Sequence, residues 1–177
     1  SGGTESDNLA VFGLGNGDGI AVCSAVEHHA VLDPVESIHG RTVPVDHRGR
    51  IDHDALGAIL AEQPVRLVSL MAVNNETGAV TDLAAAARVV RRHAPRAVLH
   101  TDAVQAACWL DLRDVWRHVD ALALSAHKFG GPKGVGILAI RAGVRLAPLL
   151  LGGGQERDRR SGTHNVAGIA ATAEALR

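Results

Sequence analysis

The chain has 177 residues, of which 46% are hydrophobic and 21% charged, and its formal net charge is -1. This length suggests one domain or slightly more, and the balanced composition argues against wholesale disorder and against a basic surface that binds nucleic acid directly. No apolar run reaches the roughly 18 residues needed to cross a bilayer, so we expect no membrane partner. Two cysteines argue against a disulfide-rich secreted scaffold, and we expect a cytoplasmic protein.

Segments of strand and helix character alternate along the chain. Most of the apolar runs are continuous rather than alternating, as in strands covered on both faces. In chain order, the sequence predicts a strand at 20–24, a helix at 30–38, a strand at 42–45, a helix at 52–63, a strand at 66–73, a helix at 82–93, strands at 97–101, 121–125 and 135–141, and a helix at 165–177. This order predicts an α/β fold in three αβα layers around a mostly parallel sheet.

The two ends of the chain suggest a longer parent. The chain begins with a glycine-rich turn and no methionine, and such a turn normally follows a strand. Residues 168–177 have the character of a helix interrupted in mid-run. We therefore expect residues 1–177 to be a piece of a longer protein that is truncated at both ends.

Polar side chains follow four successive predicted strands. They lie at residues 27–29, 74–76, 102–105 and 127–128. In open α/β sheets, ligands bind in the crevice beyond the carboxyl ends of the strands. The sequence therefore predicts a functional site at this end of the sheet.

The lysines are few and close together. Of the 18 basic residues only two are lysines, Lys128 and Lys133, and both lie in a glycine-rich stretch. A lysine at the end of a buried strand can act as a nucleophile towards a carbonyl, because an apolar crevice disfavours its protonated form. The alternative is a solvated lysine in a loop.

Two further segments indicate parts of one ligand. Asp102 follows a predicted strand and could keep a heterocyclic nitrogen protonated, although a helix cap or a metal ligand together with His100 is an alternative. Residues 2–6 could present backbone N–H groups and the Thr4 hydroxyl to a phosphate at the start of a helix. With Lys128 as the nucleophile, these groups predict pyridoxal 5'-phosphate as the cofactor and no metal.

Other segments have both a functional and an ordinary interpretation. His28 offers an imidazole for proton transfer or stacking, whereas residues 73–78 could be a simple polar turn. Residues 152–163 are rich in glycine and then basic, and could bind an anion, bind a partner subunit or form a flexible loop. Cys23 has the character of a core residue, and nothing adjacent to Cys108 marks it as an activated thiol.

The order and spacing of seven short runs resemble the cysteine desulfurases of the class V aminotransferase group, which are fold-type-I pyridoxal-phosphate enzymes. The runs are SGGTESDN (1–8), EHHAVL (27–32), VNNETG (73–78), HTDAVQ (100–105), SAHK (125–128), GPKG (131–134) and RSGT (160–163). The resemblance therefore covers the chain from its first residue to about position 165.

This resemblance implies roles for individual residues. Lys128 would form the Schiff base with the cofactor and move protons, and His28 would stack on the ring and assist proton transfer. Asp102 would bind the ring nitrogen. The ring hydroxyl would be bound near Gln105 and Asn75. The phosphate would be bound by Gly3, Thr4, Ser125, His127 and Thr163. Of these, Thr163 would reach the phosphate from the neighbouring subunit of a homodimer.

The implied activity is the conversion of L-cysteine to L-alanine, with the sulfur passed as a persulfide to an iron–sulfur scaffold or a thiolation factor. The sequence departs from the family because no segment matches the loop that carries the sulfur-accepting cysteine. The resemblance therefore implies that residues 1–177 form one pyridoxal-phosphate-binding large domain, truncated at both ends, which carries the cofactor site but is inactive alone. The alternatives are another class V enzyme, either a selenocysteine lyase or an aminotransferase, and a non-catalytic desulfurase-like interaction protein.

Overall fold

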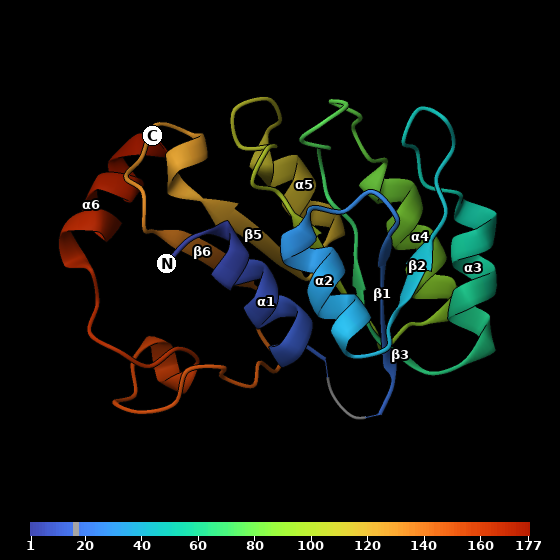
Figure 1. Cartoon of the computed structure of the whole chain (residues 1–177), viewed down its shortest axis with the longest axis horizontal. Coiled ribbons are helices and arrows are strands. Elements are labelled where there is room, and N and C mark those ends of the chain that lie inside the picture. The colour runs from blue at the N-terminus through green and yellow to red at the C-terminus, as the bar shows by residue number, and fades with distance from the viewer. Residues whose placement is uncertain (16–17) are drawn as a thin grey trace.

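The computed structural model describes residues 1–15 and 18–177, which form one sheet flanked by helices (Figure 1). The strands are β1 Ile20–Ser24, β2 Arg41–Val43, β3 Val65–Ser69, β4 Val98–Asp102, β5 Ala121–Ser125 and β6 Gly136–Ile140. The helices are α1 Gly3–Gly13, α2 His29–Ser37, α3 His53–Glu62, α4 Leu83–His93, α5 Leu112–His118 and α6 Val166–Ala175, with 3-10 turns η1 Ala126–Lys128 and η2 Glu156–Asp158. No helix within the described ranges is long and apolar enough to cross a membrane.

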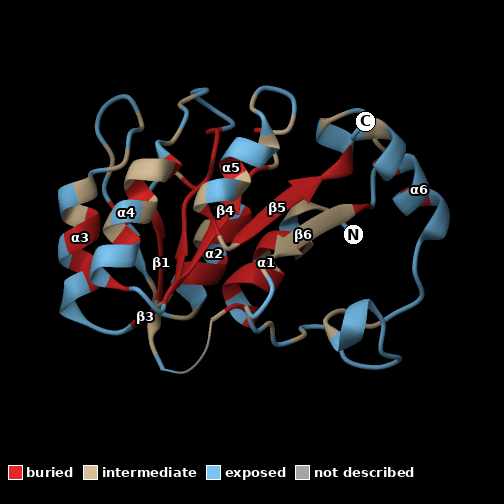
Figure 2. Cartoon of the chain, turned by 180° about the vertical axis from the view of Figure 1, so that it is seen from behind, coloured by how far each residue is buried: buried red, intermediate tan, exposed pale blue. Residues whose placement is uncertain are grey.

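The six strands are arranged in the order β2-β1-β3-β4-β5-β6, and all neighbouring pairs except β5 and β6 are parallel. Helices α1 and α2 cover one face of the sheet, and α3, α4 and α5 cover the other (Figures 1 and 2). The predicted three-layer α/β fold is therefore confirmed.

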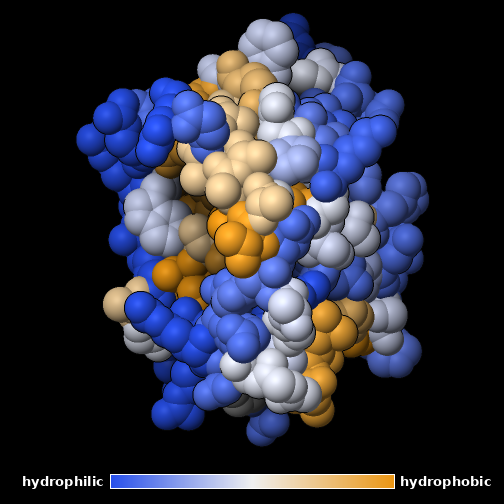
Figure 3. Space-filling view, turned by 90° about the vertical axis from the view of Figure 1, so that its left-hand side faces the viewer, coloured by the Kyte–Doolittle hydropathy of each residue, from blue (hydrophilic) through white to orange (hydrophobic). Residues whose placement is uncertain are grey.

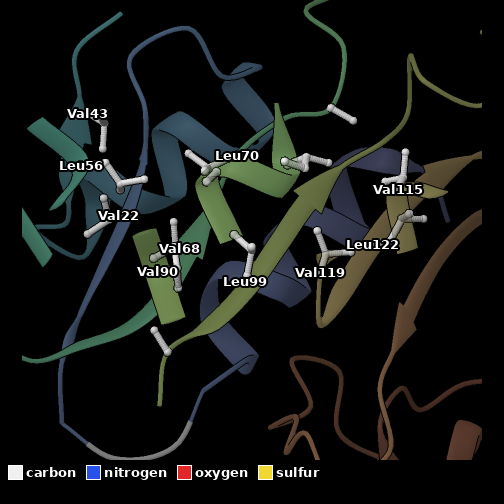
Figure 4. Close-up of a cluster of buried hydrophobic side chains, with 14 of the residues drawn as sticks. Val22, Val43, Leu56, Val68, Leu70, Val90, Leu99, Val115, Val119 and Leu122 are labelled. Carbon is white, nitrogen blue, oxygen red and sulfur yellow. The ribbon is translucent and has the colours of Figure 1, made fainter. Parts of the chain in front are cut away.

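The apolar core lies on both faces of the sheet because the central strands are buried on both sides. On the face of α3 and α4, Leu56 and Val90 pack with Val22, Val68 and Leu99 from the strands (Figure 4). The neighbouring residues along the same strands point to the opposite face of the sheet, where they pack under α1 and α2. The continuous apolar character of the strand sequences follows from this double burial.

Strand β6 runs antiparallel to β5 because the connection between them is short. The connection is residues 126–135, and its one helical element is the short turn η1. The backbone adopts the left-handed conformation at Gly130 (φ 86°) and Gly134 (φ 81°), which lets the chain turn back. Such a connection cannot cross over the sheet, whereas parallel neighbours need a crossover of a dozen or more residues.

Three other details differ from the predicted elements. For α1, the sequence predicts a helix start near residues 2–6 but not the extent of the helix. The strand predicted at 66–73 ends at Ser69, although the N–H groups of Leu70 and Ala72 still donate to carbonyls of β4 while the chain bends away. Helix α5 is missing from the predicted elements because it has only seven residues and its short pattern resembles a loop. Its N-cap, Asp111, accepts a hydrogen bond from the N–H of Arg113.

Helix α2 contains Pro34 in its interior, and α1 compensates for the missing hydrogen bond. Proline has no N–H, so the carbonyl of Ala30, four residues earlier, lacks its helical donor. Asn8 of α1 supplies a donor, because its Nδ2 lies 3.1 Å from Ala30 O and 2.9 Å from Thr4 O. The proline therefore helps to fix how α1 packs against α2.

Replacing Asn8 with alanine is expected to lower the free energy of unfolding by about 1–3 kcal/mol, because the carbonyl of Ala30 loses its donor. In a Pro34→Ala background the restored N–H at position 34 can serve that carbonyl, so the same Asn8→Ala change is expected to cost less. Urea unfolding of the four proteins of this double-mutant cycle measures the difference. Equal costs in both backgrounds would contradict the compensation.

Candidate functional site

A cavity of about 360 Å³ lies beyond the carboxyl ends of β4 and β5 and beside the N-terminal ends of α1 and α2. Residues from all four of the predicted strand-end clusters contribute to its wall. The lining residues are Gly3, Thr4, Asp7, His28, Ala30, Met71, Val73, Asn75, Asp102, Val104, Gln105, Ser125, His127 and Lys128. Nine of the ten residues predicted for the site therefore share one cavity, and the tenth, Thr163, lies elsewhere in the chain.

The N-terminus of α1 forms one end of the cavity. The first N–H groups of an α-helix have no intrahelical acceptor, and the N-cap of α1, Gly2, has no side chain that could accept from them. A side chain at Gly3 would approach Val104 and Ser125, with the nearest atom at 2.9 Å. The absence of a side chain at this position lets the start of α1 lie against the ends of β4 and β5, beside the cavity.

Close backbone packing holds this helix start in place. A Cβ atom at Gly136, the first residue of β6, would clash with the carbonyl oxygen of Gly2. The glycine therefore lets the segment before α1 cross directly over β6. This contact places the amides of α1 at the carboxyl end of β5.

Ser125, His127 and Lys128 come from the end of β5 and the turn that follows. Ser125 Oγ lies 2.9 Å from His127 Nδ1. Lys128 lines the cavity but is exposed to solvent, so the apolar enclosure expected from the sequence is not observed. Lys133 is also exposed and does not line the cavity, which distinguishes the two lysines by position.

Asp102 lies at the end of β4 and is buried. Its Oδ1 accepts a hydrogen bond from the N–H of Val104 at 2.8 Å. Burial raises the pKa of Asp102, whereas that hydrogen bond and the charges of His28 and Lys128 lower it. A protonated nitrogen of a ligand in the cavity would oppose the effect of burial and favour the carboxylate form.

His28 is the N-cap of α2, and this role fixes its ring. Its Nδ1 accepts a hydrogen bond from the N–H of Ala30 at 3.0 Å. The proton of the neutral imidazole is therefore on Nε2. The sequence predicted a chemically active histidine here, and the structure adds the reason for its orientation.

The turn at residues 74–78 carries Asn75 to the cavity. Asn74 stabilises the turn, because its Oδ1 accepts hydrogen bonds from the N–H groups of Glu76 and Thr77. Its Nδ2 donates to Val26 O at 2.8 Å, which ties the turn to the segment before His28. This segment is therefore both a structural turn and a part of the cavity wall.

Glu27, next to His28, anchors the wall from inside the protein. Its Oε1 accepts hydrogen bonds from Ser24 Oγ at 2.7 Å and from the N–H of Met71 at 2.8 Å. Burial raises the pKa of Glu27 to about 8, despite these two hydrogen bonds. The folded state therefore favours the protonated carboxyl near neutral pH.

This shift predicts a pH dependence of stability. Because the folded pKa of about 8 lies above the ordinary value of 4.5, the contribution of Glu27 is fully present below 4.5 and is lost as the pH rises through 8. Between pH 4.5 and about pH 8, each unit of rising pH is expected to lower the free energy of unfolding by up to ~1.4 kcal/mol through Glu27. Glu27→Gln should flatten the dependence in urea titrations of the full-length protein, and an unchanged slope would contradict the assignment.

Asp7 is a cavity residue to which sequence reasoning gave no role. It lies in α1, faces the sheet and is buried. Its position in the helix, one turn after Gly3, was the available signal, since a side chain there shares the helix face that begins at the cavity. The sequence alone does not show that this face is covered.

Thr163 lies in an exposed loop before α6 and does not line the cavity of its own chain. The neighbouring Arg160 ties this loop to the first turn of α1, because its Nε lies 2.8 Å from Glu5 Oε1 and its Nη2 lies 3.2 Å from Glu5 Oε2. This pairing lowers the pKa of Glu5 to about 2. The loop is therefore fixed beside the helix start, with Thr163 outside the cavity of this chain.

Neither cysteine lines the cavity. Cys23 is buried, and burial raises the pKa of its thiol. Cys108 is exposed, and its Sγ donates to Lys128 O at 3.2 Å. Within the described ranges, no group of three or more histidine, cysteine, aspartate or glutamate side chains is arranged to hold a metal ion.

The cavity residues fit pyridoxal 5'-phosphate. The open amides at Gly3 and Thr4 suit a phosphate, the lysine amine of Lys128 suits a carbonyl, and the buried carboxyl of Asp102 suits a protonated ring nitrogen. These three groups approach one cavity from α1, η1 and β4. The distribution of donors and acceptors therefore matches the three polar parts of this cofactor.

Comparison with known proteins identifies the family. Residues 1–177 match the family model described as aminotransferase class-V. The chain is 40% identical over 185 residues to cysteine desulfurase IscS of Dictyoglomus turgidum and 46% identical over 178 residues to a cysteine desulfurase of Cereibacter sphaeroides. These alignments cover 99% and 96% of this chain but 46% and 45% of the relatives, so the chain spans about half the length of the curated relatives it matches.

Solved structures show the same relationship. A NifS-like protein has a TM-score of 0.88 at 39% identity, and DndA from Streptomyces lividans has a TM-score of 0.85 at 37% identity. Both superpositions cover 99% of this chain, and they cover 50% and 53% of the respective structures. The chain therefore belongs to the aminotransferase class-V family of pyridoxal-phosphate-dependent proteins, with cysteine desulfurases among its homologues.

Proposed function

We propose that this chain carries the cofactor site of a cysteine desulfurase. The observation that carries the proposal is the approach of Lys128, Asp102 and the open start of α1 to one cavity. The identity to cysteine desulfurases over almost the whole chain supports the same activity. We further propose that these residues act within a larger protein and are inactive alone.

At the phosphate end, the N–H groups of Gly3 and Thr4 would donate to the phosphate, assisted by the dipole of α1. Ser125 Oγ and the His127 ring would complete this part of the site. At the ring end, Asp102 would accept a hydrogen bond from the ring nitrogen and His28 would stack on the ring. Gln105 would bind the ring hydroxyl, with Asn75 close by. When bound, the cofactor supplies an electron-accepting ring that weakens bonds at the substrate Cα.

Two side chains would move protons at the substrate. Lys128 Nζ would hold the cofactor at its carbonyl carbon and, as an amine beside the substrate, would move the Cα proton. His28 Nε2 is the ring nitrogen that carries a proton in the neutral form, since Nδ1 is engaged with Ala30. His28 would therefore serve as a proton donor or acceptor at the cavity mouth.

The reaction balances without an external oxidant. L-Cysteine and an acceptor thiol would give L-alanine and an acceptor persulfide, because the sulfur leaves carbon and bonds to the acceptor sulfur. Cys23 is buried and Cys108 does not line the cavity, so we propose an acceptor thiol outside these two positions. An iron–sulfur scaffold or a thiolation factor would receive the persulfide.

A homodimer is part of the proposal. Thr163 lies outside the cavity of its own chain and would bind the phosphate in the neighbouring subunit. The side of the molecule that carries α6 has apolar surface among polar surroundings (Figure 3). Exposed apolar side chains in this part of the chain are Leu149, Leu150, Leu151, Val166, Ile169 and Leu176, and such exposure is typical of surfaces that bind protein.

The experiment is turnover of L-cysteine by the full-length protein loaded with pyridoxal phosphate, with a thiol present. The proposal predicts equal amounts of alanine and sulfide. Preference for L-selenocysteine would indicate a selenocysteine lyase, and amino transfer to a keto acid would indicate an aminotransferase. Cofactor binding without turnover of any of these substrates would indicate an interaction protein and would contradict the desulfurase assignment.

A further inference from the structure

A buried aspartate–histidine pair lies behind the cavity, between α1 and the sheet. The side chain of Asp7 is 1% exposed and that of His100 is 0% exposed. Asp7 Oδ1 and His100 Nε2 are 3.8 Å apart, and neither atom has a hydrogen-bond partner within the described part of the chain. One proton held between these two atoms would satisfy both, with only a small adjustment of the side chains.

The other nitrogen of His100 indicates where the ring proton lies. His100 Nδ1 is 2.8 Å from Ser69 Oγ, and the two residues are direct neighbours across β3 and β4. If Nδ1 carries the ring proton, it donates to Ser69 Oγ. His100 Nε2 is then an acceptor directed towards Asp7.

The charged groups around the pair determine where the shared proton lies. Burial raises the pKa of Asp7, and the negative charge of Asp102 on β4 raises it further, as does Glu27 before α2 at pH values where it is ionised. Burial lowers the pKa of His100 to about 3. His28 and Lys128 also face this region, and positive charge on either side chain lowers the pKa of Asp102. All of these effects favour a protonated Asp7 beside a neutral His100.

We propose that Asp7 is a protonated carboxyl that donates to His100 Nε2, and that this uncharged pair leaves Asp102 as the carboxylate that faces the cofactor. The inference rests on the proposed function, because a ring nitrogen must be bound by Asp102. A second carboxylate in the same cavity would repel Asp102 and compete for the same N–H. Asp7 and His100 are therefore positioning residues that act through Asp102.

A second aspartate–histidine pair in the same chain provides an internal comparison. His29 Nδ1 lies 2.9 Å from Asp33 Oδ1 on the surface of α2, where the side chains are 81% and 67% exposed. The hydrogen bond to Asp33 raises the pKa of His29. Exposure beside Asp33 thus favours the protonated form of His29, whereas burial favours the uncharged form of His100.

Nitrogen-15 NMR of the histidine rings tests the proposal in the cofactor-free, full-length protein, with a His100→Gln variant to assign the signal. Between about pH 5 and pH 9, His100 is expected to remain neutral with the proton on Nδ1, while His29 titrates above its ordinary value. An imidazolium at His100, or a proton on its Nε2, would overturn the proposal. This result does not depend on cofactor binding, so it is separate from the test of the proposed function.

A matched pair of substitutions tests the effect on the site. Asp7→Asn keeps a neutral donor towards His100, whereas Asp102→Asn removes the proposed charge. We expect the pH midpoint of the visible band of bound pyridoxal phosphate to move in Asp102→Asn and to stay within about 0.3 units in Asp7→Asn. An equal shift in both variants would overturn the proposal, whereas a wild-type protein that forms no band would contradict the proposed function instead.

Discussion

Lys128→Ala is expected to abolish covalent binding of pyridoxal phosphate and to lower desulfuration by about 10³-fold or more, because the variant loses both the nucleophile and the proton carrier. The visible absorbance of the bound cofactor and alanine formation from L-cysteine measure the two effects. Lys128→Arg should show the same loss, since a guanidinium keeps the charge but is not a nucleophile.

Lys133 provides the matched control for this prediction. It follows Lys128 in the same glycine-rich stretch, but it is exposed and lies outside the cavity. Lys133→Ala is expected to keep both the absorbance band and the activity. A band that survives Lys128→Ala, or one that disappears in Lys133→Ala, would contradict the assignment.

Asp102→Ala is expected to lower the rate of desulfuration at least about 100-fold and to weaken cofactor binding, because the ring nitrogen loses its anionic partner. The ring then accepts electrons poorly, so the loss should appear in kcat as well as in cofactor affinity. Kinetics at saturating pyridoxal phosphate separate the two effects.

The exposed Asp114 of α5 is the control for Asp102. It forms a surface ion pair with Arg117, with Asp114 Oδ1 and Arg117 Nη1 2.7 Å apart. Asp114→Ala removes a carboxylate of the same size that does not line the cavity, and we expect wild-type kinetics. Similar rate losses in the Asp102 and Asp114 variants would show that the effect is not specific to the site.

The main layout of the fold could be predicted because it depends on local patterns. Continuous apolar runs and aspartate N-caps such as Asp52 and Asp82 define strands and helices within a few residues. The carboxyl ends of parallel strands meet at one edge, so the strand pattern alone was enough to place Asp102 and Lys128 together. The direction of β6 follows from the shortness of its connection to β5.

Features that depend on packing between distant segments could not be predicted. The role of Asn8 requires the contact between α1 and α2, and the burial of Asp7 and His100 requires α1 to cover β4. The exposure of Lys128 likewise depends on which segments surround the cavity. A sequence pattern shows which face of an element is polar, whereas tertiary packing decides whether that face is covered.

Peptide mapping after borohydride reduction tests the central claim most directly, because reduction fixes bound pyridoxal phosphate to the amine that holds it. The full-length protein is loaded with the cofactor, reduced, digested and analysed by mass spectrometry. The account predicts the modification on the peptide that contains Lys128. Modification at Lys133, or at no lysine of this segment, would contradict it.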